Sequence, residues 1–463
     1  IFFSVYFSFL GASFYSFFYK EKIKINDFLK LNIIGIFTLY IFTSIWNIFL
    51  PINKYTFLIT LIPIVSFLSK NFWKSITQLK SVLNRQSFFF VISIFLTLIW
   101  VSNIGLGPLQ YEPQYHLQKI RWSQQFALTP GLTNLYDHYG FDSSFFCFIA
   151  FFDNMFKYSM WNLSGYLKLT CIVYFLLIPI QIIHFNKNAI KGSYIMRIFF
   201  TPIIIYYCFY YKGSSTDLFA SFFGITLAIN MYKIFIEKQN DYVQLLMLLV
   251  LGFSAKMIFL PIAVSSIIVL LIFKNKILLD FFFKRKIITT VFIFGFSLQL
   301  FRNIILTGYP FYPKDFISIP VTWKYPKDKL EKLNNTMSHW PVGLPKTNKN
   351  YINDKREWLR TRFFLQHRKV ETLYPVMLGI LGLVLIFKKG KKTLLKNFFL
   401  FSIPAIVQIL FFFLMVTDNR FANFAFWWLG AGFISLPVKQ LIIDKRENLV
   451  FLAMLIIIFS FGL

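Results

Sequence analysis

Charged residues are scarce in this chain, and that scarcity decides its class. Of its 463 residues, 14% are charged and 57% are hydrophobic, with 63 Phe among them. The mean hydropathy is +0.61. A soluble globular protein of this length needs far more polar surface to meet water. The composition therefore excludes a soluble domain and predicts an integral membrane protein.

Cysteine is rare as well, and the familiar catalytic motifs are missing. The three cysteines, Cys147, Cys171 and Cys208, lie inside apolar runs without metal-ligand spacing, which is typical of small packing residues. The sequence contains no P-loop, no GxGxxG, no HExxH and no internal repeat of fixed period. Nucleotide hydrolysis, dinucleotide chemistry and zinc hydrolysis therefore have no local support.

Acidic residues are few beside the basic ones. The chain has 19 Asp and Glu against 48 Lys and Arg, which gives a net charge of +29. Most of the basic residues form short clusters between apolar runs, where the positive-inside rule places them. The excess is thus explained by membrane topology, and we expect the partner to be a lipid bilayer and not a nucleic acid.

Apolar runs near the ~20 residues that a helix needs to cross hydrocarbon recur along the chain. They predict an all-α protein of about 14 transmembrane helices, at 1–19, 31–50, 54–69, 88–104, 162–184, 194–211, 217–235, 242–254, 257–273, 286–304, 372–387, 396–416, 421–437 and 448–463. Because the chain begins at Ile1 and ends inside an apolar run at Leu463, we expect it to be a fragment.

The Lys-rich connections set the expected orientation. They lie at 20–30, 70–87, 185–193, 274–286, 388–396 and 438–447. All of them fall on the cytoplasmic side if the run 141–156 is a short interfacial or re-entrant helix. If that run were a full span, the connection 185–193 would face outward. We therefore expect a short helix there, with the polar loops on the outward face.

This orientation divides the chain into four parts. Residues 1–87 are expected to form N-terminal transmembrane helices that are an accessory addition. Residues 88–304 form a transmembrane core with an outward catalytic loop at 105–161. The long outward loop 305–371 is predicted to be a lid or an acceptor-binding segment, because long loops in compact proteins are often functional. Residues 372–463 form the C-terminal transmembrane helices.

A dense group of polar residues between 106 and 144 interrupts the apolar sequence, and such a group beside a span suggests function. Its members are Glu112, His116, Arg121, Asp137, His138 and Asp142. Glu112 is the strongest candidate, because desolvation near the membrane can raise a carboxyl pKa toward that of a general base. The plainer alternatives are a solvated carboxylate for Glu112, a structural hydrogen bond for His116, and ordinary turn chemistry for the two aspartates.

Further polar residues stand at the outward ends of other spans. Asp217 follows Ser and Thr at the start of a span, so it either caps a helix or faces a shared cavity. Arg302 either reaches lipid headgroups or points inward, where a guanidinium suits a phosphate. Lys256, between two short apolar runs, is a second phosphate candidate. Asp418 and Arg420 share a short turn and could pair only with each other.

The order of several short motifs resembles a known family. They are an acid shortly before Tyr115 and His116, PGLTNL at 130–135, GFDSSFF at 140–146, STDL at 215–218, RNIILTGYPFYP at 302–313 and DNRF at 418–421. This order is similar to that in a bacterial family of polytopic proteins, largely uncharacterised, that are placed among the glycosyltransferases. More broadly, the chain resembles the GT-C superfamily of membrane glycosyltransferases, over about residues 88–437.

The resemblance implies a GT-C-like helix arrangement and transfer, with inversion, of a sugar from a polyprenyl-phosphate donor to a glycan, lipid or protein acceptor of the cell envelope. It implies a bacterial inner membrane with the active site facing the periplasm or exterior. Glu112 would then be the base, with His116 and Asp217 as the other catalytic candidates. Candidates to bind the substrate or its phosphate are Arg121, Lys256, Arg302, Tyr309, Tyr312, Asp418 and Arg420. Candidates to position the acceptor or the loop are Asp137, His138 and Asp142.

Two departures and two rival functions stay open. Glu112 has no adjacent acid, although GT-C enzymes often carry paired acids there, so the use of a divalent cation is undecided. Three more spans precede the first loop than in the simplest relatives. A polysaccharide polymerase or ligase would need cations more than a base. A flippase or transporter of lipid-linked sugar tends to show repeated halves, and none is detected.

Overall fold

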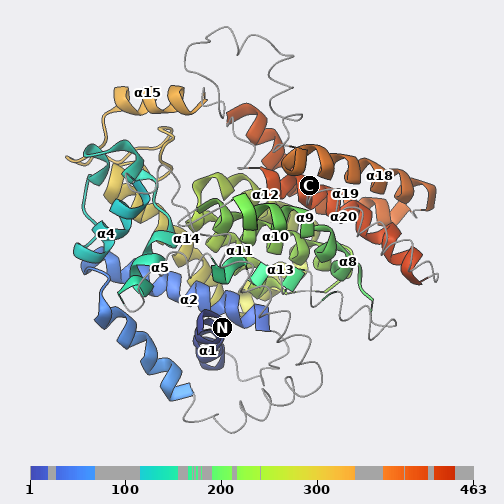
Figure 1. Ribbon diagram of the computed structural model, residues 1–463, viewed down its shortest axis with the longest axis horizontal. Helices are drawn as coiled ribbons and strands as arrows, with labels where there is room; N and C mark the ends of the chain where they lie inside the picture. Colours follow the sequence, from blue (N-terminus) through green and yellow to red (C-terminus); the bar gives the residue numbers. More distant parts are fainter. Residues whose placement is uncertain are drawn as a thin grey trace.

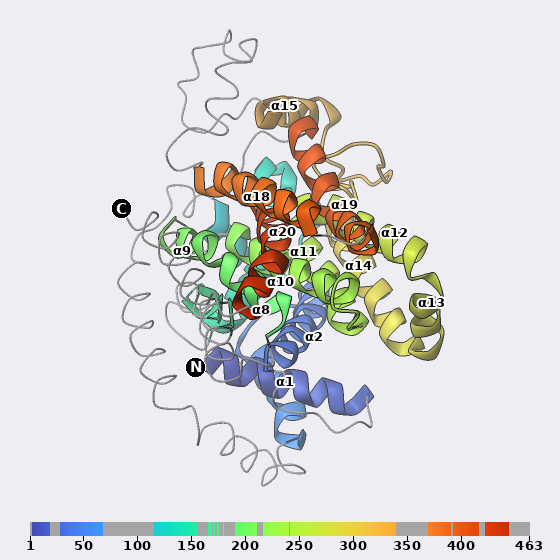
Figure 2. The same ribbon diagram turned by 90° about the vertical axis from the view of Figure 1, so that its right-hand side faces the viewer.

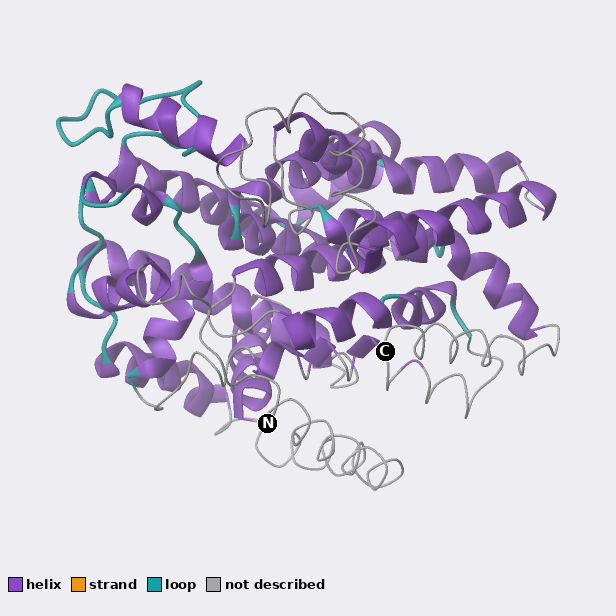
Figure 3. Ribbon diagram, turned by 45° about the horizontal axis from the view of Figure 1, so that its top comes forward, coloured by secondary structure: helices purple, strands orange, loops and turns teal. Residues whose placement is uncertain are grey.

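Helices form all the regular secondary structure in the part of the protein that the computed structural model describes (Figure 3). That part comprises residues 2–18, 28–67, 115–154, 165–168, 170–171, 174–175, 179, 190–210, 216–239, 241–338, 369–389, 392–415 and 422–443. No strand occurs in these ranges. The predicted all-α class is therefore confirmed for them.

Within the described ranges, five helices are long and apolar enough to cross a membrane, as expected for an integral membrane protein. They are Leu29–Phe49, Thr216–Phe235, Lys286–Thr307, Lys369–Phe387 and Leu395–Phe413. A sixth span results if Met257–Phe273 and Lys276–Lys284, which meet at a bend of 107°, are one broken span. Most predicted apolar runs inside the described ranges coincide with a helix, but the run 194–211 is divided between two short helices, Gly192–Phe199 and Thr201–Tyr210. The runs 88–104 and 448–463, and most of 162–184, lie outside the described residues.

The helices follow one another along the chain without intervening sheet (Figure 1). The α-helices are α1 (Phe2–Phe18), α2 (Phe28–Phe49), α4 (Leu117–Gln125), α5 (Ser144–Asp153), α8 (Gly192–Phe199), α9 (Thr201–Tyr210), α10 (Thr216–Phe235), α11 (Tyr242–Ala255), α12 (Leu260–Phe273), α13 (Asn275–Lys284), α14 (Lys286–Thr307), α15 (Lys327–Ser338), α18 (Tyr374–Lys389), α19 (Lys392–Met415) and α20 (Asn423–Ile443). Short helical turns are η3 (Leu132–Asn134), η4 (Asp137–Gly140), η7 (Met257–Phe259) and η10 (Lys369–Leu373), and a further helix covers Lys54–Phe67.

Helices α10 and α11 form the centre of the bundle. Nearly every residue of both helices is buried, because their sequences are apolar on all faces and need protein around them. Helix α10 packs against α11 and α20, while α11 packs against α14 and α2. In Figures 1 and 2 they lie between α2 and α14 on one side and α18, α19 and α20 on the other.

Helix α5 occupies most of the run 141–156 and has only ten residues. That length agrees with the expectation of a short helix and is well below the ~20 residues of a span. Every residue from Ser144 to Phe152 is buried, and the helix packs against α2, α4 and α11. The apolar faces of α5 thus contact protein, and whether the helix is interfacial or re-entrant stays a prediction.

One end of the bundle gathers the polar segments, and we call it the polar end. Helix α10 begins there, whereas α11 and α14 end there. Residues 126–143 lie across it and are held by the backbone of α14: Gly131 N–H donates to Ile305 O at 2.9 Å, and Thr133 Oγ1 donates to Leu306 O at 2.8 Å. Helix α15 belongs to the same end, near α4 (Figure 1).

Helices α1 and α2 cross so closely that glycine is required at the contact. A Cβ on Gly35 would collide with the backbone carbonyl of Phe7, and a Cβ on Gly11 would collide with that of Leu31. Neither obstacle is a side chain that can rotate away. The two helices must therefore separate if either glycine gains a side chain.

We predict that Gly35→Ala lowers the midpoint of thermal unfolding in detergent, because overpacking costs about 1–3 kcal/mol. Gly379→Ala is the matched control. Its added Cβ would lie 3.7 Å from the nearest heavy atom, the Cα of Gly430, and alanine is the better helix former by about 1 kcal/mol. Equal midpoints for the two variants would contradict the close crossing.

Candidate functional site

A buried arginine organises the polar end. Arg302, on α14, is 1% exposed, and its guanidinium reaches three segments. Nε donates to Asp142 Oδ2 at 2.7 Å, and one terminal nitrogen donates to Asp142 Oδ1 at 3.3 Å. The same nitrogen reaches Asn47 Oδ1 at 3.3 Å and Cys147 Sγ at 3.6 Å, while the other donates to Ser44 O at 3.1 Å. Arg302 thus points inward and ties α14 to α2 and to the segment before α5.

Asp142 is the acid at the centre of this arrangement. Its side chain is 2% exposed. Burial alone would raise the pKa of its carboxyl, but the charges of Arg302 and Lys119, together with hydrogen bonds from Arg302 and Gln299, lower that pKa below its ordinary value. Asp142 is therefore held as a carboxylate. Asp142 is thus far more buried than Asp137, whose side chain is 31% exposed.

Lys119, on α4, is the second cation beside Asp142. Its side chain is 3% exposed; Nζ lies 3.8 Å from Asp142 Oδ1 and donates to Tyr139 O at 2.6 Å. Burial lowers the pKa of Lys119 to about 8, although Asp142 opposes the shift. Lys119 is buried although nothing in its sequence context distinguishes it from a solvated lysine of an interfacial helix.

Asp217 and Lys256 form a second ion pair at the same end. Asp217 is in the first turn of α10, where the helix dipole favours a carboxylate, and Lys256 follows the last residue of α11. The side chain of Lys256 is 25% exposed and that of Asp217 is 9% exposed. The structure therefore brings together two residues that the sequence identifies separately, and it leaves the cation reachable.

The loop that carries Asp142 is also attached to the end of α11 beside Lys256. Ser143 Oγ donates to Ala255 O at 2.8 Å, and the hydroxyls of Ser144 and Ser254 lie 2.9 Å apart. These contacts fix the first ion pair relative to the second. The two pairs belong to one polar cluster and not to opposite faces of the bundle.

Tyr115 lies between the two ion pairs. Its hydroxyl donates to Phe141 O at 3.1 Å. Burial raises the pKa of Tyr115 well above its ordinary value, and the charges of Asp142 and Asp217 raise it further.

Both predicted histidines stand beside Tyr115. The ring of His116 lies 4.6 Å from that of Tyr115 and 5.0 Å from that of Phe146, by centroids. His138 Nδ1 lies 2.6 Å from Asp137 Oδ1, and both side chains are partly exposed. The His138 ring is 5.7 Å from that of Tyr115. His116 is thus packed among rings, whereas the aspartate–histidine pair can meet a ligand.

The remaining described candidates lie further from the ion pairs. Arg121 is exposed on α4. The hydroxyl of Tyr312 donates to Asp137 O at 2.8 Å and that of Tyr309 donates to Tyr325 O at 3.1 Å. Burial raises the pKa of Tyr312, as do the charges of neighbouring tyrosines and Asp137. Both tyrosines are buried with their hydroxyls engaged, an arrangement suited to holding the loop.

The first part of the long outward loop covers the polar segment. Its buried residues form a small cluster with Phe141 and Met337, made of Tyr309, Tyr312, Tyr325, Leu330 and Leu333. Asn134 Nδ2 also donates to Trp323 O at 2.8 Å. The segment from 308 to 338 is therefore packed against residues 128–142. Residues 339–368 of the predicted loop lie outside the described residues.

Three predicted site residues, Glu112, Asp418 and Arg420, lie outside the described residues. Their roles stay predictions. Within the described ranges, no three His, Cys, Asp or Glu side chains gather in a way that could hold a metal ion. The divalent cation that the resemblance leaves open stays a prediction as well.

Glu371 is a buried acid that the sequence does not single out. It belongs to η10 and is 1% exposed, with Tyr206 Oη donating to Oε1 at 3.4 Å. The adjacent Tyr207 donates to Asn423 Oδ1 at 2.7 Å, so the ends of α9 and α20 meet η10. The sequence signal for Glu371 is an acid directly before the apolar run 372–387, at the end of the predicted loop 305–371.

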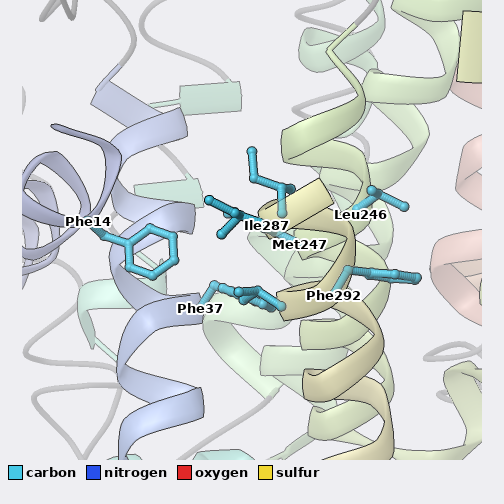
Figure 4. Close-up of a pocket in the computed structure, with 8 residues that line it drawn as sticks. Phe14, Phe37, Leu246, Met247, Ile287 and Phe292 are labelled. Carbon is cyan, nitrogen blue, oxygen red and sulfur yellow. The ribbon is translucent and has the colours of Figure 1, made fainter. Parts of the chain in front are cut away.

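The pocket in Figure 4 is of a different kind. Its lining is wholly apolar and comes from α1, α2, α11 and α14, with Phe14, Phe37, Met247 and Phe292 among its residues. Ile287 also lines it, and fifteen residues of α14 separate Ile287 from Arg302, which is roughly 22 Å of helix. This pocket has no polar group for a sugar or a phosphate.

Comparison with known proteins gives a family. A family model described as a domain of unknown function, DUF8201, matches residues 1–427, so the chain belongs to that family. No curated protein and no solved structure matches the chain. The description of the family names no activity, so the function has to be argued from the site.

We predict that Arg302→Met lowers the free energy of unfolding by about 3–5 kcal/mol, because it leaves the Asp142 carboxylate buried without its main partner. Asp142→Asn should also destabilise the protein. The double variant should lose less than the sum of the two losses, by about 0.5–3 kcal/mol. Thermal unfolding of the four proteins in detergent measures this, and strict additivity would show that the two residues are energetically independent.

The low pKa of Lys119 predicts a pH dependence. Between pH 8 and about 10.4, the ordinary pKa of lysine, the unfolded chain binds more protons at this residue than the folded protein. Stability contributed by Lys119 therefore rises with pH in that window and is constant below it. The unfolding midpoint of the wild type should rise relative to that of Lys119→Met from pH 8 to 10. Lys284→Met, at an exposed lysine, is the control.

Proposed function

We propose that the chain is an inverting GT-C-type membrane glycosyltransferase. It would transfer a sugar from a polyprenyl-phosphate donor to a glycan, lipid or protein acceptor of the cell envelope. The observation that carries the proposal is the partly exposed pair of Asp217 and Lys256, fixed beside the buried pair of Asp142 and Arg302. A partly exposed cation beside a carboxylate, at the polar end of an otherwise apolar bundle, suits a phosphate-linked substrate with a lipid tail.

Lys256 is the better of the two phosphate candidates. The nitrogen atoms of Arg302 already donate to protein acceptors from α2 and from Asp142. A phosphate would have to displace those contacts inside a dry interior. Lys256 also has a protein partner, Asp217, but a quarter of its side chain is exposed, so a phosphate can approach its ammonium group from solvent. Arg302 then acts by holding the loop, and Arg420 stays a further candidate for phosphate.

The reaction follows from these assignments. The bond between the anomeric carbon and the phosphate oxygen breaks, and a bond from the acceptor oxygen to that carbon forms on the opposite side. The acceptor proton passes to a general base, for which Glu112 is the candidate. Lys256 stabilises the charge on the departing phosphate. Asp217 keeps Lys256 in place, and His116 is the candidate to position the acceptor or the base.

The wider architecture is part of the proposal. It comprises about fourteen spans in a GT-C-like arrangement, in a bacterial inner membrane, with the polar end facing the periplasm or exterior. Support comes from α14, whose first residue, Lys286, closes the Lys-rich connection 274–286, while its last residue, Thr307, lies at the polar end. One basic connection is thus at the end of the bundle opposite the candidate site.

One observation favours a second candidate, a polysaccharide polymerase or ligase that uses lipid-linked glycans. Asp142 and Asp217 are both paired with cations, and pairing makes a carboxylate a weaker base. A site rich in paired cations fits the binding of a diphosphate leaving group as well as a monophosphate. The length of the glycan on the donor lipid distinguishes the two candidates.

We predict that Lys256→Met lowers the rate of sugar transfer from a labelled polyprenyl-phosphate donor by about 10²–10³, the usual effect of removing a transition-state charge stabiliser. Glu112→Gln should lower it by about 10²–10⁴, through loss of the base. Lys284→Met, an exposed lysine outside the site, is the control and should keep full activity.

The same assay separates the alternatives. Unchanged turnover by Glu112→Gln would remove Glu112 from catalysis, and unchanged turnover by Lys256→Met would remove the phosphate-binding role. Activity with oligosaccharide-linked lipid alone would assign a polymerase or ligase. Movement of lipid-linked sugar across vesicles, with no chemical change, would assign a flippase and reject transfer.

A further inference from the structure

A second buried arginine lies far from the polar end. Arg197 is on α8 and is 5% exposed. Among the residues that the structure describes, none forms an ion pair or a hydrogen bond with its guanidinium, and Nε is a buried donor without an acceptor. Arg302 differs in this respect, because each nitrogen of its guanidinium donates to an acceptor.

Aromatic rings hold the Arg197 guanidinium instead. Its Cζ lies 3.9 Å from the ring centroid of Tyr174 and 5.3 Å from that of Tyr194. A guanidinium stacked on a ring is stabilised through its face, so its N–H edge stays free to donate in plane. The rings therefore orient the donors of Arg197 without satisfying them.

The acid on the neighbouring segment is already engaged. Glu237, just after α10, accepts from the backbone N–H of Ser193 at 2.7 Å and from its hydroxyl at 3.0 Å. It thereby satisfies the start of α8, one turn before Arg197. Both of its oxygens accept from Ser193, and within the described residues Glu237 forms no ion pair with Arg197.

A second polar group close by in the chain also lacks a partner. Thr201 follows Arg197 by four residues and begins α9, directly after the turn at Phe200 that ends α8. Its side chain is 2% exposed, and Oγ1 makes no hydrogen bond in the described part of the protein. An arginine and a hydroxyl thus stand at the junction of α8 and α9, both buried and both with hydrogen-bonding capacity to spare.

An uncompensated charge in such surroundings is costly, and ionisable groups within apolar helices usually serve a ligand or a pathway. We propose that Arg197 and Thr201 form a binding site for a phosphate group, brought by an anionic lipid headgroup or by free phosphate. A planar guanidinium fork matches phosphate oxygens in geometry and charge, and the threonine hydroxyl supplies a further donor.

The site is separate from the proposed transferase centre. Helix α8 packs against α20 and α10, away from α4 and α15 in Figure 1 and away from α15 in Figure 2. Arg197 also follows the Lys-rich connection 185–193, which is expected on the cytoplasmic side. The bound phosphate would therefore stand at the opposite membrane surface from the reaction.

The test is thermal unfolding of the purified full chain in detergent, with three additions in parallel: phosphatidylglycerol, diacylglycerol and inorganic phosphate. We expect phosphatidylglycerol or phosphate to raise the unfolding midpoint of the wild type, and diacylglycerol to leave it unchanged. Arg197→Met should weaken the binding at least tenfold. Arg197→Lys, which keeps the charge and loses the fork, and Thr201→Val should each weaken it less. Lys286→Met, at an exposed lysine, is the control.

The outcomes distinguish the sources. A shift with phosphatidylglycerol alone assigns a lipid headgroup, and a shift with inorganic phosphate assigns a site open to the free ion. Without either addition, Arg197→Met should unfold at a higher temperature than the wild type, because an unpaired buried charge has been removed. The proposal is overturned if neither phosphate compound shifts the wild type, or if Arg197→Met shifts as much as Lys286→Met.

Discussion

The ion pair between Arg302 and Asp142 is the constraint on which the polar end depends. Removing two charges from water costs several kcal/mol per ion, and the interior returns that energy only where hydrogen bonds are complete. Here they are nearly complete, since the guanidinium reaches Ser44 O and Asn47 as well as the carboxylate, and Lys119 approaches the same acid. The pair therefore fixes α2, α4, α14 and the loop before α5 in one geometry.

A difference in exposure separates structural from chemical roles at this end. The side chains of Arg302 and Asp142 are 1% and 2% exposed, whereas that of Lys256 is 25% exposed. A buried pair gives rigidity, and a partly solvated pair can exchange its partner for a substrate at low cost. The loop contacts through Ser143 transmit the rigidity of the first pair to the second, which is how a preorganised site is supported.

The sequence predicts the helices much better than it predicts their surroundings. Apolar runs fix where a helix forms, because lipid and protein interior both require internally satisfied backbone. Apolar runs do not say whether a helix faces lipid or protein. The sequence therefore does not predict that α5 is buried in protein. The sequence singles out both Asp142 and Arg302 but does not predict that they pair. They are 160 residues apart, and a helix that is apolar on all faces gives no periodic signal from which its rotation could be predicted. The sequence does not predict the burial of Glu371, because an acid beside a long polar loop is expected to be solvated.

Arg302 and Arg197 show that the same residue type can have opposite meanings in one apolar chain. The first has a carboxylate, an amide and a carbonyl around it, and the protein alone accounts for its burial. The second has rings on its face and no acceptor among the described residues. Selection for stability alone would favour an apolar side chain at such a position. A ligand with negative charge is the physical reason for an arginine to stand there.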